Sequence, residues 1–510
     1  MKKYILILSL TFCSVTISIA QSIQLDNALQ FSQNIYEGTA RFQAMGGAFA
    51  ALGGDFTSLS INPAGVAVYR SSEVSFTPAL AIAGTSAGYM GNTIDDSKTR
   101  FGLGSIGYVS AFPTYNIEGL MSVNFGIGFN KLQNNTQRFS AGARTSRDAS
   151  LSYLRHLAMG LSTDNISEAD FETRATDEEW LAMTTGLLAH IENHDGNYIG
   201  ATEAFHPQYR DSLDLIYQMG DIDQLLYRNQ SGYVGEYTFS TGINLSDLFY
   251  FGLSLGVQEI NHSLYEEYQE KAVNMADFDE ANGGVGFQRL IYTYNNETKG
   301  IGYNLKFGAI TRPIGGLRVG AYIHTPTWMF LHEHWTKDMT SVLKSGKYDA
   351  NIAPSDYYYR VQAPFRWGAG LAYTFGSIGL ISVDYEGVGY SGLKLREDNG
   401  SFGSFVGDNR YLDDYYRSTT TNIRVGGELR LNAIALRAGY AYYQNPGKEM
   451  KAIQIGSVGI GYRGEYFFID GAYSFSPDNT QLRDLYAGNP NIVSTSTFLS
   501  KIAITIGWRF

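Results

Sequence analysis

The sequence predicts an all-β fold, namely a transmembrane antiparallel β-barrel of about 14 strands with an N-terminal plug and a long, partly helical external loop. Two patterns support this fold: apolar and polar residues alternate along many segments, and the connections between those segments are alternately short and long. No run of apolar residues in the mature chain is long enough for a membrane helix. The composition agrees, because the 510 residues include 57 Gly, 37 Tyr, 29 Phe and 5 Trp but only 17% charged residues.

Residues 1–20 have the features of a secretory signal peptide. Two lysines precede an apolar stretch, and Ser18 and Ala20 provide the small residues of a cleavage site. The single cysteine of the chain, Cys13, lies inside this segment. We therefore expect an exported mature chain without thiol chemistry. Its net charge is more negative than the −11 of the full chain, which argues against nucleic acid as a partner.

Residues 21–71 precede the first expected strand and are typical of helices and turns. The stretch 44–54 is made mostly of glycine and alanine. Small residues allow the backbone to approach its neighbours closely, and a barrel of this size has room for an internal segment. We expect residues 21–71 to plug the barrel.

Residues 72–510 carry the strand pattern of the barrel. At the end of the chain, for example, Ile504, Ile506 and Trp508 share one face while Thr505 and Gly507 lie on the other. The expected strands span residues 72–84, 100–112, 120–130, 231–243, 248–262, 288–312, 317–334, 356–375, 378–392, 415–431, 433–444, 453–463, 466–476 and 498–510.

The connections between these segments also fit an outer-membrane barrel. Short turns at 245–247, 313–316, 376–377 and 463–465 alternate with much longer loops. In such barrels the short turns lie on the periplasmic side, the long loops lie outside, and the number of strands is even. The turns therefore predict an up-and-down barrel in the outer membrane of a Gram-negative cell.

The external loop 131–230 is too long to lack structure of its own. Apolar residues at helical spacing, among them Trp180 and Leu187, predict an amphipathic helix, and a second helix is expected around Leu213, Ile216 and Tyr217. One interpretation is a helical cap folded on the barrel rim. The other is an apolar groove at the mouth, in which Trp180 and Leu187 first bind a ligand.

Arginines on the polar face of the strands are further candidates for ligand binding. An uninterrupted alternation over 356–375 places Arg360 and Arg366 inside the barrel, and an arginine at a lipid-facing midplane position would cost roughly 2–4 kcal/mol. These side chains either form salt bridges in the lumen or hold the carboxylate of a ligand by bidentate hydrogen bonds.

No motif predicts catalysis, a metal site or a bound cofactor. Two G-x-G-x-x-G matches, at 102–107 and 459–464, lie in strands without a following helix. His324, His332 and His334 share one face of their strand if Pro326 does not shift the alternation. A haem-contacting surface is therefore an alternative to ordinary polar lining of the lumen.

The N-terminal segment resembles a known family. Residues 38–42, 45–55 and 62–65 resemble the plug of FadL-type outer-membrane transporters of hydrophobic compounds, in the branch found in Bacteroidetes-like bacteria. Residues 436–442 and the terminal Phe510 resemble the late strands of that family. The plug residues marked by the resemblance are Gly46, Gly47, Asp55, Asn62, Pro63, Ala64 and Gly65.

The resemblance implies a monomeric channel, not an enzyme, for passive uptake of long-chain fatty acids or other apolar molecules. A ligand would bind at the external loops, pass to a pocket above the plug and leave sideways beside a kinked third strand, in which Gly126 and Gly128 permit a kink. Phe42 and Phe49 of the plug are candidate ligand contacts. The expected surroundings are outer-membrane lipid and lipopolysaccharide. The alternatives are a haem receptor and a barrel-anchored component of a secretion or surface assembly.

Overall fold

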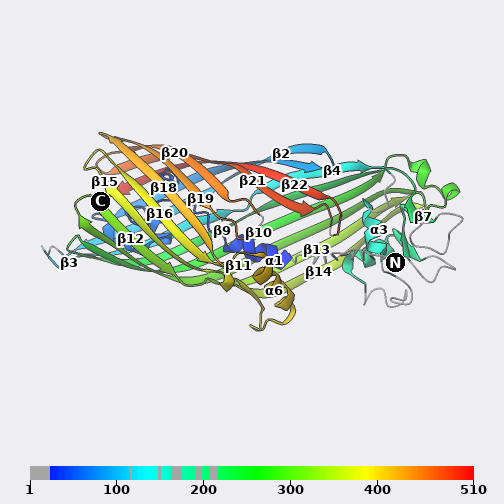
Figure 1. The fold of residues 1–510 in the computed structure, drawn as a ribbon, viewed down its shortest axis with the longest axis horizontal. Helices are drawn as coiled ribbons and strands as arrows, with labels where there is room; N and C mark the ends of the chain where they lie inside the picture. The colour runs from blue at the N-terminus through cyan, green and yellow to red at the C-terminus, as the bar shows by residue number, and fades with distance from the viewer. Residues whose placement is uncertain are drawn as a thin grey trace, which may run out of the picture.

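Antiparallel strands close into a barrel in the computed structural model, which describes residues 23–114, 116, 118–146, 151–159, 161, 175–190, 198–205, 216–448, 450–486 and 488–510. Closure is direct, because the first strand pairs with both the second strand and the last. The sheet has 18 strands in the described residues, and four of them continue an interrupted neighbour, so the wall of the barrel is 14 strands around. Figure 1 shows the barrel from the side.

The strands follow one another around the wall in chain order. They are β1 (Glu73–Tyr89), β2 (Asn92–Pro113), β3 (Leu120–Asn134) continued by β4 (Gln137–Thr145), β9 (Ile222–Leu245), β10 (Phe249–Ala272), β11 (Phe287–Ile314), β12 (Leu317–His324) continued by β13 (Trp328–Leu343), β14 (Gly346–Gln362) continued by β15 (Phe365–Thr374), β16 (Gly379–Gly389) continued by β17 (Lys394–Glu397), β18 (Thr420–Leu431), β19 (Ile434–Tyr443), β20 (Ile453–Arg463), β21 (Phe467–Asp484) and β22 (Ile492–Arg509).

The two ends of the barrel differ. The C-terminus and the short turns, such as the one between β18 and β19, lie at one end, which we call the turn end (left in Figure 1). The long connections lie at the other end, which we call the loop end. The wall is also uneven, since β18, β19 and β20 have 12, 10 and 11 residues whereas β9, β10 and β11 have 24, 24 and 28. The long strands extend to the loop end and carry a cap there.

The cap is built from the connection between β4 and β9. Its described residues form two short helices and two small hairpins, which are α3 (Tyr153–Ala158), α5 (Asp177–Thr184), β5 (Leu188–His190) with β6 (Tyr198–Gly200), and β7 (Glu203–Phe205) with β8 (Ile216–Gln218). Their apolar side chains form one buried cluster with the ends of the long strands, including Phe139, Leu290 and Met339. The cap therefore has a hydrophobic core of its own.

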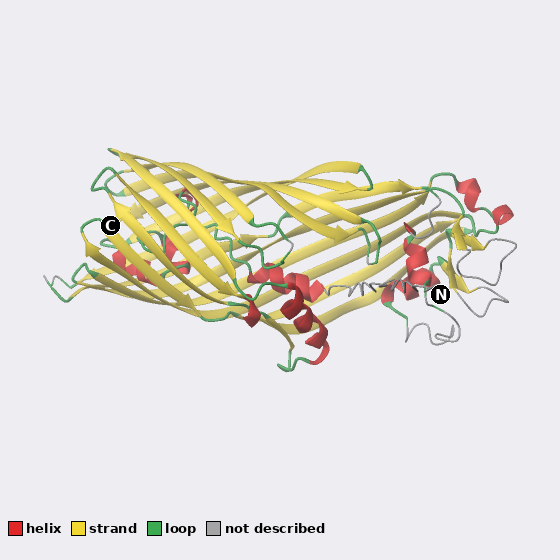
Figure 2. Cartoon of the chain, in the orientation of Figure 1, coloured by secondary structure: helices red, strands yellow, loops and turns green. Residues whose placement is uncertain are grey.

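The plug occupies the interior of the barrel (Figure 2). Its elements are α1 (Ile23–Ser32), α2 (Ala40–Ala44) and the 3-10 helices η1 (Phe56–Ser60) and η2 (Pro63–Val68). The remaining helical segments lie in the loops and are η6 (Met275–Phe278), η7 (Glu280–Asn282), η8 (Tyr390–Gly392), η9 (Gly403–Phe405) and α6 (Val406–Tyr415). Among the residues that the structure describes, no helix is long and apolar enough to span a membrane.

The outer face of the wall is apolar. Along β10, Phe251, Leu253 and Leu255 are each more than 40% exposed, while the alternate residues Ser254 and Gln258 are buried inside. The same alternation recurs on the other long strands. This arrangement turns an apolar belt outwards and polar groups inwards, the reverse of a soluble protein.

The predicted fold class is confirmed, and each expected strand corresponds to one position around the wall. The long loop is shorter than 131–230, because β4 and the first half of β9 belong to the wall and leave 146–221 as the connection. The second expected helix is wrong: Ile216 and Tyr217 lie in β8, and Leu213 lies outside the described residues. The predicted signal peptide also lies outside them.

Candidate functional site: a plugged barrel with an interrupted seam

The plug contacts the wall where the wall has no side chains. On ten strands an inward position is a glycine, and a Cβ built there would lie within 3.0 Å of a plug atom, closer than an unstrained contact allows. Several of these glycines are direct cross-strand partners, so neighbouring strands present them at the same level of the lumen. We call this set the glycine belt; it comprises Gly107, Gly126, Gly242, Gly252, Gly308, Gly320, Gly370, Gly426, Gly439 and Gly459.

Asn62 connects the plug to two wall strands. Its buried amide nitrogen donates to the carbonyl oxygen of Ala50 in the plug at 2.6 Å, and to those of Ala309 and Ala321 at 3.3 and 3.4 Å. Its carbonyl oxygen accepts from the backbone N–H of Ala64 at 3.1 Å, which caps the start of η2, where Pro63 needs no donor. The Asn-Pro-Ala element is therefore a structural link between plug and wall.

The other motif residues of the plug shape its turns. The Asp55 carboxylate accepts from the Thr39 hydroxyl at 2.8 Å and from the Thr57 N–H at 3.0 Å, and so begins η1. Gly46 and Gly47 end α2 with φ angles of +60° and +75°, a left-handed conformation that favours glycine. Gly65 has no side chain where Ser58 packs against it. All these positions hold the plug in shape.

Phe42 and Phe49 form the core of the plug. Their rings stack with centroids 5.3 Å apart, and the Tyr36 ring packs edge-on against Phe42 at 6.4 Å. Both phenylalanines are fully buried, and the guanidinium of Arg41 covers Phe49 at 5.2 Å. Binding of a ligand to these two rings would therefore require the plug to rearrange. Their predicted contact with ligand stays a prediction.

Arg366 lies inside the barrel, as predicted. Its guanidinium pairs with the buried Glu386 at 3.3 Å and also donates to the carbonyl of Ser32 in the plug. Glu386 pairs in addition with Arg424 at 2.7 Å. Arg366 borders a cavity of about 20 Å³, which is room for about one water molecule. In this arrangement Arg366 is a lumenal salt-bridge residue with one small space beside it.

Arg360 does not face the lumen, and this expectation is wrong. Residues 363 and 364 separate β14 from β15, and both Ala363 and Pro364 are buried, so the alternation changes phase between the two strands. Arg360 consequently lies on the outer face, where it pairs with Asp398 at 3.4 Å and covers the Phe330 ring at 5.1 Å.

The three histidines do not share a face. The break between β12 and β13, which contains Pro326, shifts the phase in the same way. His324 is buried and its Nε2 contacts the carbonyl oxygen of Ile61 at 2.6 Å, whereas His332 and His334 lie on the outer face and contact Asp356 at 2.7 and 3.0 Å. The single haem-contacting surface that the sequence allowed is therefore wrong.

Trp180 and Leu187 both belong to the cap. Leu187 is fully buried in its apolar core, and Trp180 packs against the same core from α5. This placement matches a helical cap on the rim, the first of the two interpretations.

Inside the cap, burial raises the pKa of the Glu203 carboxyl to about 8, although Arg155 at 3.9 Å opposes the shift.

The seam between β2 and the next strand of the wall is interrupted. β2 pairs with β3 only from Ser105–Asn130 to Pro113–Ser122, although β2 begins at Asn92. Towards the loop end β2 pairs with β1 alone, and β4 pairs with β9. In contrast, β10 and β11 pair without a shift from Phe249–Thr311 to Lys271–Arg289. We call the unpaired stretch between β2 and β3/β4 the open seam.

The open seam begins where β3 bends towards the plug. The register between β3 and β9 shifts between Lys131 and Gln133, and residues 129–133 are all buried instead of alternating. Backbone N–H groups of the plug, at Ile35 and Glu37, donate to the carbonyls of Leu132 and Lys131 at 3.0 Å each. A strand that normally completes the wall therefore pairs with the plug instead.

Gly126 and Gly128 lie in the regularly paired part of β3, with partners on both sides. Their missing side chains make room for Leu59 and Phe56 of the plug. The bend comes three residues later, at Lys131. The glycines thus serve the seating of the plug, and the expected position of the kink is wrong by a few residues.

Side chains close the open seam. Lys98 Nζ donates to the Asn229 Oδ1 at 2.5 Å and to the Gln230 carbonyl at 3.1 Å, and Arg100 Nη1 donates to the Gly232 carbonyl at 3.1 Å. These bonds cross from β2 to β9. No sequence motif marks these residues. The one feature of the sequence that marks the seam is the stretch 129–133 of β3, in which a lysine and a glutamine interrupt the apolar alternation.

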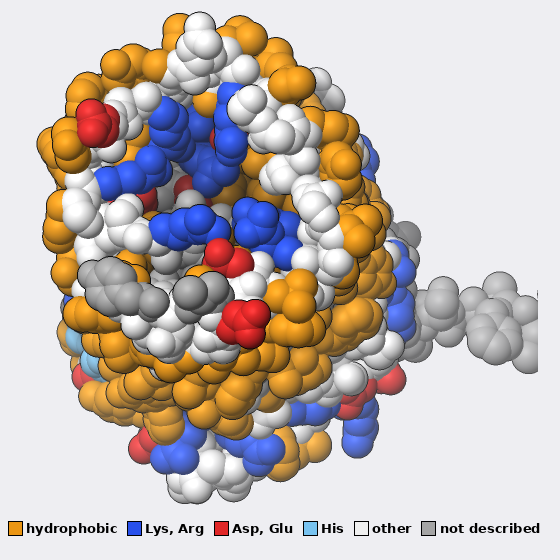
Figure 3. All heavy atoms as spheres, turned by 90° about the vertical axis from the view of Figure 1, so that its left-hand side faces the viewer, with side chains coloured by type: hydrophobic (Ala, Val, Ile, Leu, Met, Phe, Trp, Pro, Cys, Tyr) orange, Lys and Arg blue, Asp and Glu red, His pale blue; other side chains and the backbone are white. Residues whose placement is uncertain are grey.

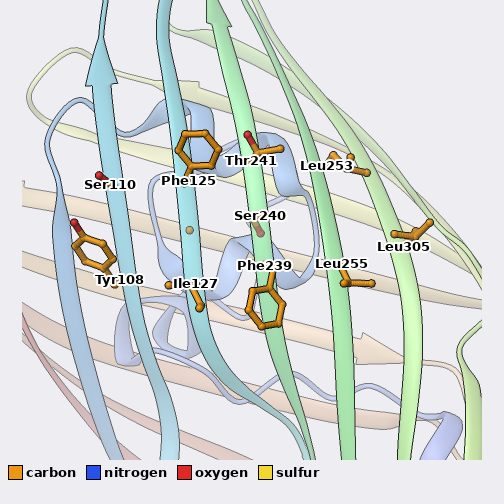
Figure 4. A pocket seen from close by; sticks show the side chains of 11 residues that line it. Tyr108, Ser110, Phe125, Ile127, Phe239, Ser240, Thr241, Leu253, Leu255 and Leu305 are labelled. Atoms are coloured by element: carbon orange, nitrogen blue, oxygen red, sulfur yellow. The ribbon is translucent and has the colours of Figure 1, made fainter.

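An apolar groove lies on the outer wall, on the turn-end side of the open seam. It has a volume of about 440 Å³ and crosses β2, β3, β9, β10 and β11. Figure 4 shows aromatic and leucine side chains along it, including Tyr108, Phe125, Phe239 and Leu255, with the plug behind the strands. The groove can therefore hold an alkyl or aryl group against the outer wall.

The turn end of the barrel is hollowed, and basic side chains gather in the hollow (Figure 3). Near this end, Arg318 is the second residue of β12; its Nη1 donates to the Leu52 carbonyl of the plug at 2.7 Å, and its charge interacts with those of Arg312, Arg41 and Arg70. Arg41 in turn pairs with Glu428 at 3.0 Å. Arginines of both plug and wall thus line the hollow at this end.

Several solved structures share this architecture. The toluene transporter TodX of P. putida superposes with a TM-score of 0.52 and 15% identity, over 93% of this chain and 99% of TodX. A FadL homologue of Pseudomonas aeruginosa superposes with a TM-score of 0.53 and 13% identity, over 93% and 98%. No family model and no curated protein sequence matches the chain. The similarity therefore lies in the fold, and the fold of this chain is that of the FadL-type outer-membrane channels.

Proposed function

We propose that the chain is an outer-membrane channel for passive uptake of hydrophobic small molecules. In this proposal the loop end faces the outside, the turn end faces the periplasm, and the apolar outer face contacts lipid and lipopolysaccharide. The barrel acts as a monomer and carries out no chemistry. The two structural neighbours, a toluene transporter and a FadL homologue, support a hydrophobic cargo.

The observation that carries the proposal is the contrast between the glycine belt and the open seam. The belt packs against the plug on ten strands, so the plug obstructs the axis of the barrel. The open seam lacks backbone hydrogen bonds between β2 and β3/β4 and is held by a few side chains. Separating those side chains costs far less than extracting the plug, so the ligand leaves sideways through the seam.

Within this class we propose long-chain fatty acids as the cargo. The groove below the seam is lined mainly by apolar side chains and suits an alkyl chain that has just left the barrel. We place the lateral gate at the bend around Lys131 and Gln133, and assign Gly126 and Gly128 to the seating of the plug. The origin in a Bacteroidetes-like bacterium stays a prediction.

A reversible crosslink across the seam tests the proposal. Asp96 of β2 and Arg138 of β4 form an ion pair at 2.8 Å across it, so cysteines at both positions can be joined by a short cleavable bis-thiol reagent. The only native cysteine lies in the predicted signal peptide. Uptake of labelled oleate by cells should fall severalfold on crosslinking and recover when the linker is cleaved.

The matched control crosslinks an intact seam. Glu297 and His334 are cross-strand partners on β11 and β13, and both side chains are exposed. Crosslinking cysteines at these positions should leave uptake unchanged. Equal uptake with the Asp96–Arg138 pair open or crosslinked would contradict lateral release. If cells carrying the channel showed no more oleate uptake than cells without it, the function itself would be wrong, and co-purified secreted proteins would then favour the assembly alternative.

A further inference from the structure

Three cations act on a single carboxylate at the open seam, and a fourth cation lies beside them. Glu37 of the plug is buried and pairs with Lys501 of β22 at 2.6 Å and with Lys131 of β3 at 3.8 Å. Arg100 of β2 adds to the positive potential at Glu37. Lys98 lies two residues before Arg100, and the positive charges of these two side chains repel each other. We call Lys98, Arg100, Lys131 and Lys501 the seam cations.

The charges of this cluster are not balanced. Within the described part of the chain, Glu37 is the one carboxylate paired with the seam cations, and Lys98 and Arg100 bond only amide and carbonyl oxygens. Both side chains are half-buried. Partly desolvated cations without a counter-charge are costly, and such groups are usually paired or bind a ligand. A channel for uncharged hydrocarbons has no use for this arrangement.

Polar atoms without partners lie at the same bend of the wall. Among the described residues, Gln133 Oε1 and Asn135 Nδ2 are buried and have no hydrogen-bond partner, although both residues are more than nine-tenths buried. They lie two and four residues after Lys131, where β3 no longer pairs with β2 and bonds to the plug while it still pairs with β9. Buried polar atoms are nearly always satisfied by protein, water or ligand. The bend therefore has free hydrogen-bonding capacity beside an excess of positive charge.

We propose that the open seam is a binding site for the carboxylate head group of an amphipathic acid, held chiefly by Arg100 and Lys98. This inference rests on the proposed function and adds that the cargo is recognised by its charge at the exit. The Arg100 guanidinium can exchange its single bond to the Gly232 carbonyl for two bonds to a carboxylate. Lys98 exchanges neutral acceptors for an anionic one in the same way.

The position of the cluster agrees with the route. The seam cations of β2 lie towards the loop end of the apolar groove, which begins at Tyr108 on the same strand. An acid leaving through the seam thus has its head group towards the loop end and its chain towards the membrane interior. Lipids of the outer leaflet have the same orientation, so the acid enters the membrane without turning over.

Binding of two matched probes to the full-length channel in mild detergent tests the site. Oleate and oleyl alcohol share one alkyl chain and differ in head-group charge. The double variant Arg100→Gln/Lys98→Gln removes two seam cations. Neither cation forms an ion pair with a carboxylate of the described residues, so the substitutions leave no carboxylate there without its partner. We expect this double variant to bind oleate about tenfold more weakly, the order of one charge-assisted hydrogen bond, and to bind oleyl alcohol as before.

The control variant removes two charges elsewhere. Arg144 and Lys347 are exposed and pair with Asp223 and Asp349 at 2.9 Å each. Arg144→Gln with Lys347→Gln should change the binding of neither probe, and heat-modifiable gel migration reports whether each barrel is folded. An unchanged ratio of oleate to alcohol affinity in the folded Arg100/Lys98 variant would overturn the site and leave the proposed function standing. Failure of the wild type to bind either probe would instead overturn the proposed function.

Discussion

Two seams of this barrel show how differently the same wall can be held together. Between β10 and β11 the backbones pair continuously from one end to the other. Between β2 and β3/β4 the pairing stops at Ser105 and Asn130, and charged side chains and the plug take its place. The first seam is stabilised by the many hydrogen bonds of a ladder, whereas the second depends on a few groups that can exchange partners. The open seam can therefore separate without breaking a backbone ladder.

The largest expected effect is at the open seam. Glu37→Gln removes the carboxylate shared by Lys131 and Lys501 and leaves both buried ammonium groups without it. Removing one partner of a buried ion pair typically costs about 3–5 kcal/mol, and we expect a loss of stability of about that size in this variant. We expect a clear loss of thermal stability, measured by the temperature at which the barrel unfolds on gels. An unchanged unfolding temperature would mean that the charges do not hold the seam.

The second-largest effect is expected for a substitution in the glycine belt at the intact seam. Gly308 of β11 faces Asn62, and Gly308→Leu would force the plug away from the wall. Overpacking of this kind costs about 1–3 kcal/mol, and a displaced plug should raise ion conductance in planar bilayers. Gly84→Leu is the control, because nothing lies within 4 Å of a Cβ at that position. Equal conductance in the two variants would show that the belt does not seat the plug.

A rise in pH should lower the stability of the cap but not that of the wall. The pKa of Glu203 is raised to about 8 by burial, so the folded cap favours the protonated carboxyl. This contribution to stability is complete below the ordinary pKa of the group, declines as the pH rises above it and is lost once the pH exceeds about 8. Hydrogen exchange in α3 should accelerate between pH 6 and pH 9, while exchange in β10 and β11 follows only the intrinsic rate. In Glu203→Gln the extra pH dependence of α3 should disappear.

The smallest effect is expected for an ion pair on the regular wall. Lys299 and Glu297 of β11 pair at 3.0 Å with both side chains exposed. Exposed pairs contribute about 0–1 kcal/mol, so Glu297→Gln should hardly shift the unfolding temperature. A loss as large as that of Glu37→Gln would remove the distinction between the two seams.

The sequence predicted the wall well, because alternation is a direct consequence of a strand with lipid on one side and a lumen on the other. It failed where the alternation changes phase. Pro326 and Pro364 each lie in a break between strands, and no local pattern shows that the side chains beyond the break exchange faces, which misplaced Arg360 and two histidines. The plug motif was recognisable through its small residues and its Asn-Pro-Ala element.

The open seam could not be predicted for a different reason. Its residues come from β2, β3, β22 and the plug, and their proximity depends on which strands pair and where the pairing stops. Glu37 and Lys501 are far apart in the sequence and carry no motif. The unusual run of residues from 129 to 133 was visible, but a bend towards the plug follows only when the plug is in place.

The glycine belt also bears on how the molecule is assembled. A wall without side chains at this level has nothing of its own to fill the lumen. The N–H of Ala40 in the plug donates to the hydroxyl of Thr505 in β22 at 2.7 Å, and the same hydroxyl lies 2.8 Å from that of Thr77 in β1. The contacts that join the first strand to the last thus include the plug. The closed junction between the first and the last strand is consequently complete only when the N-terminal segment lies inside the barrel.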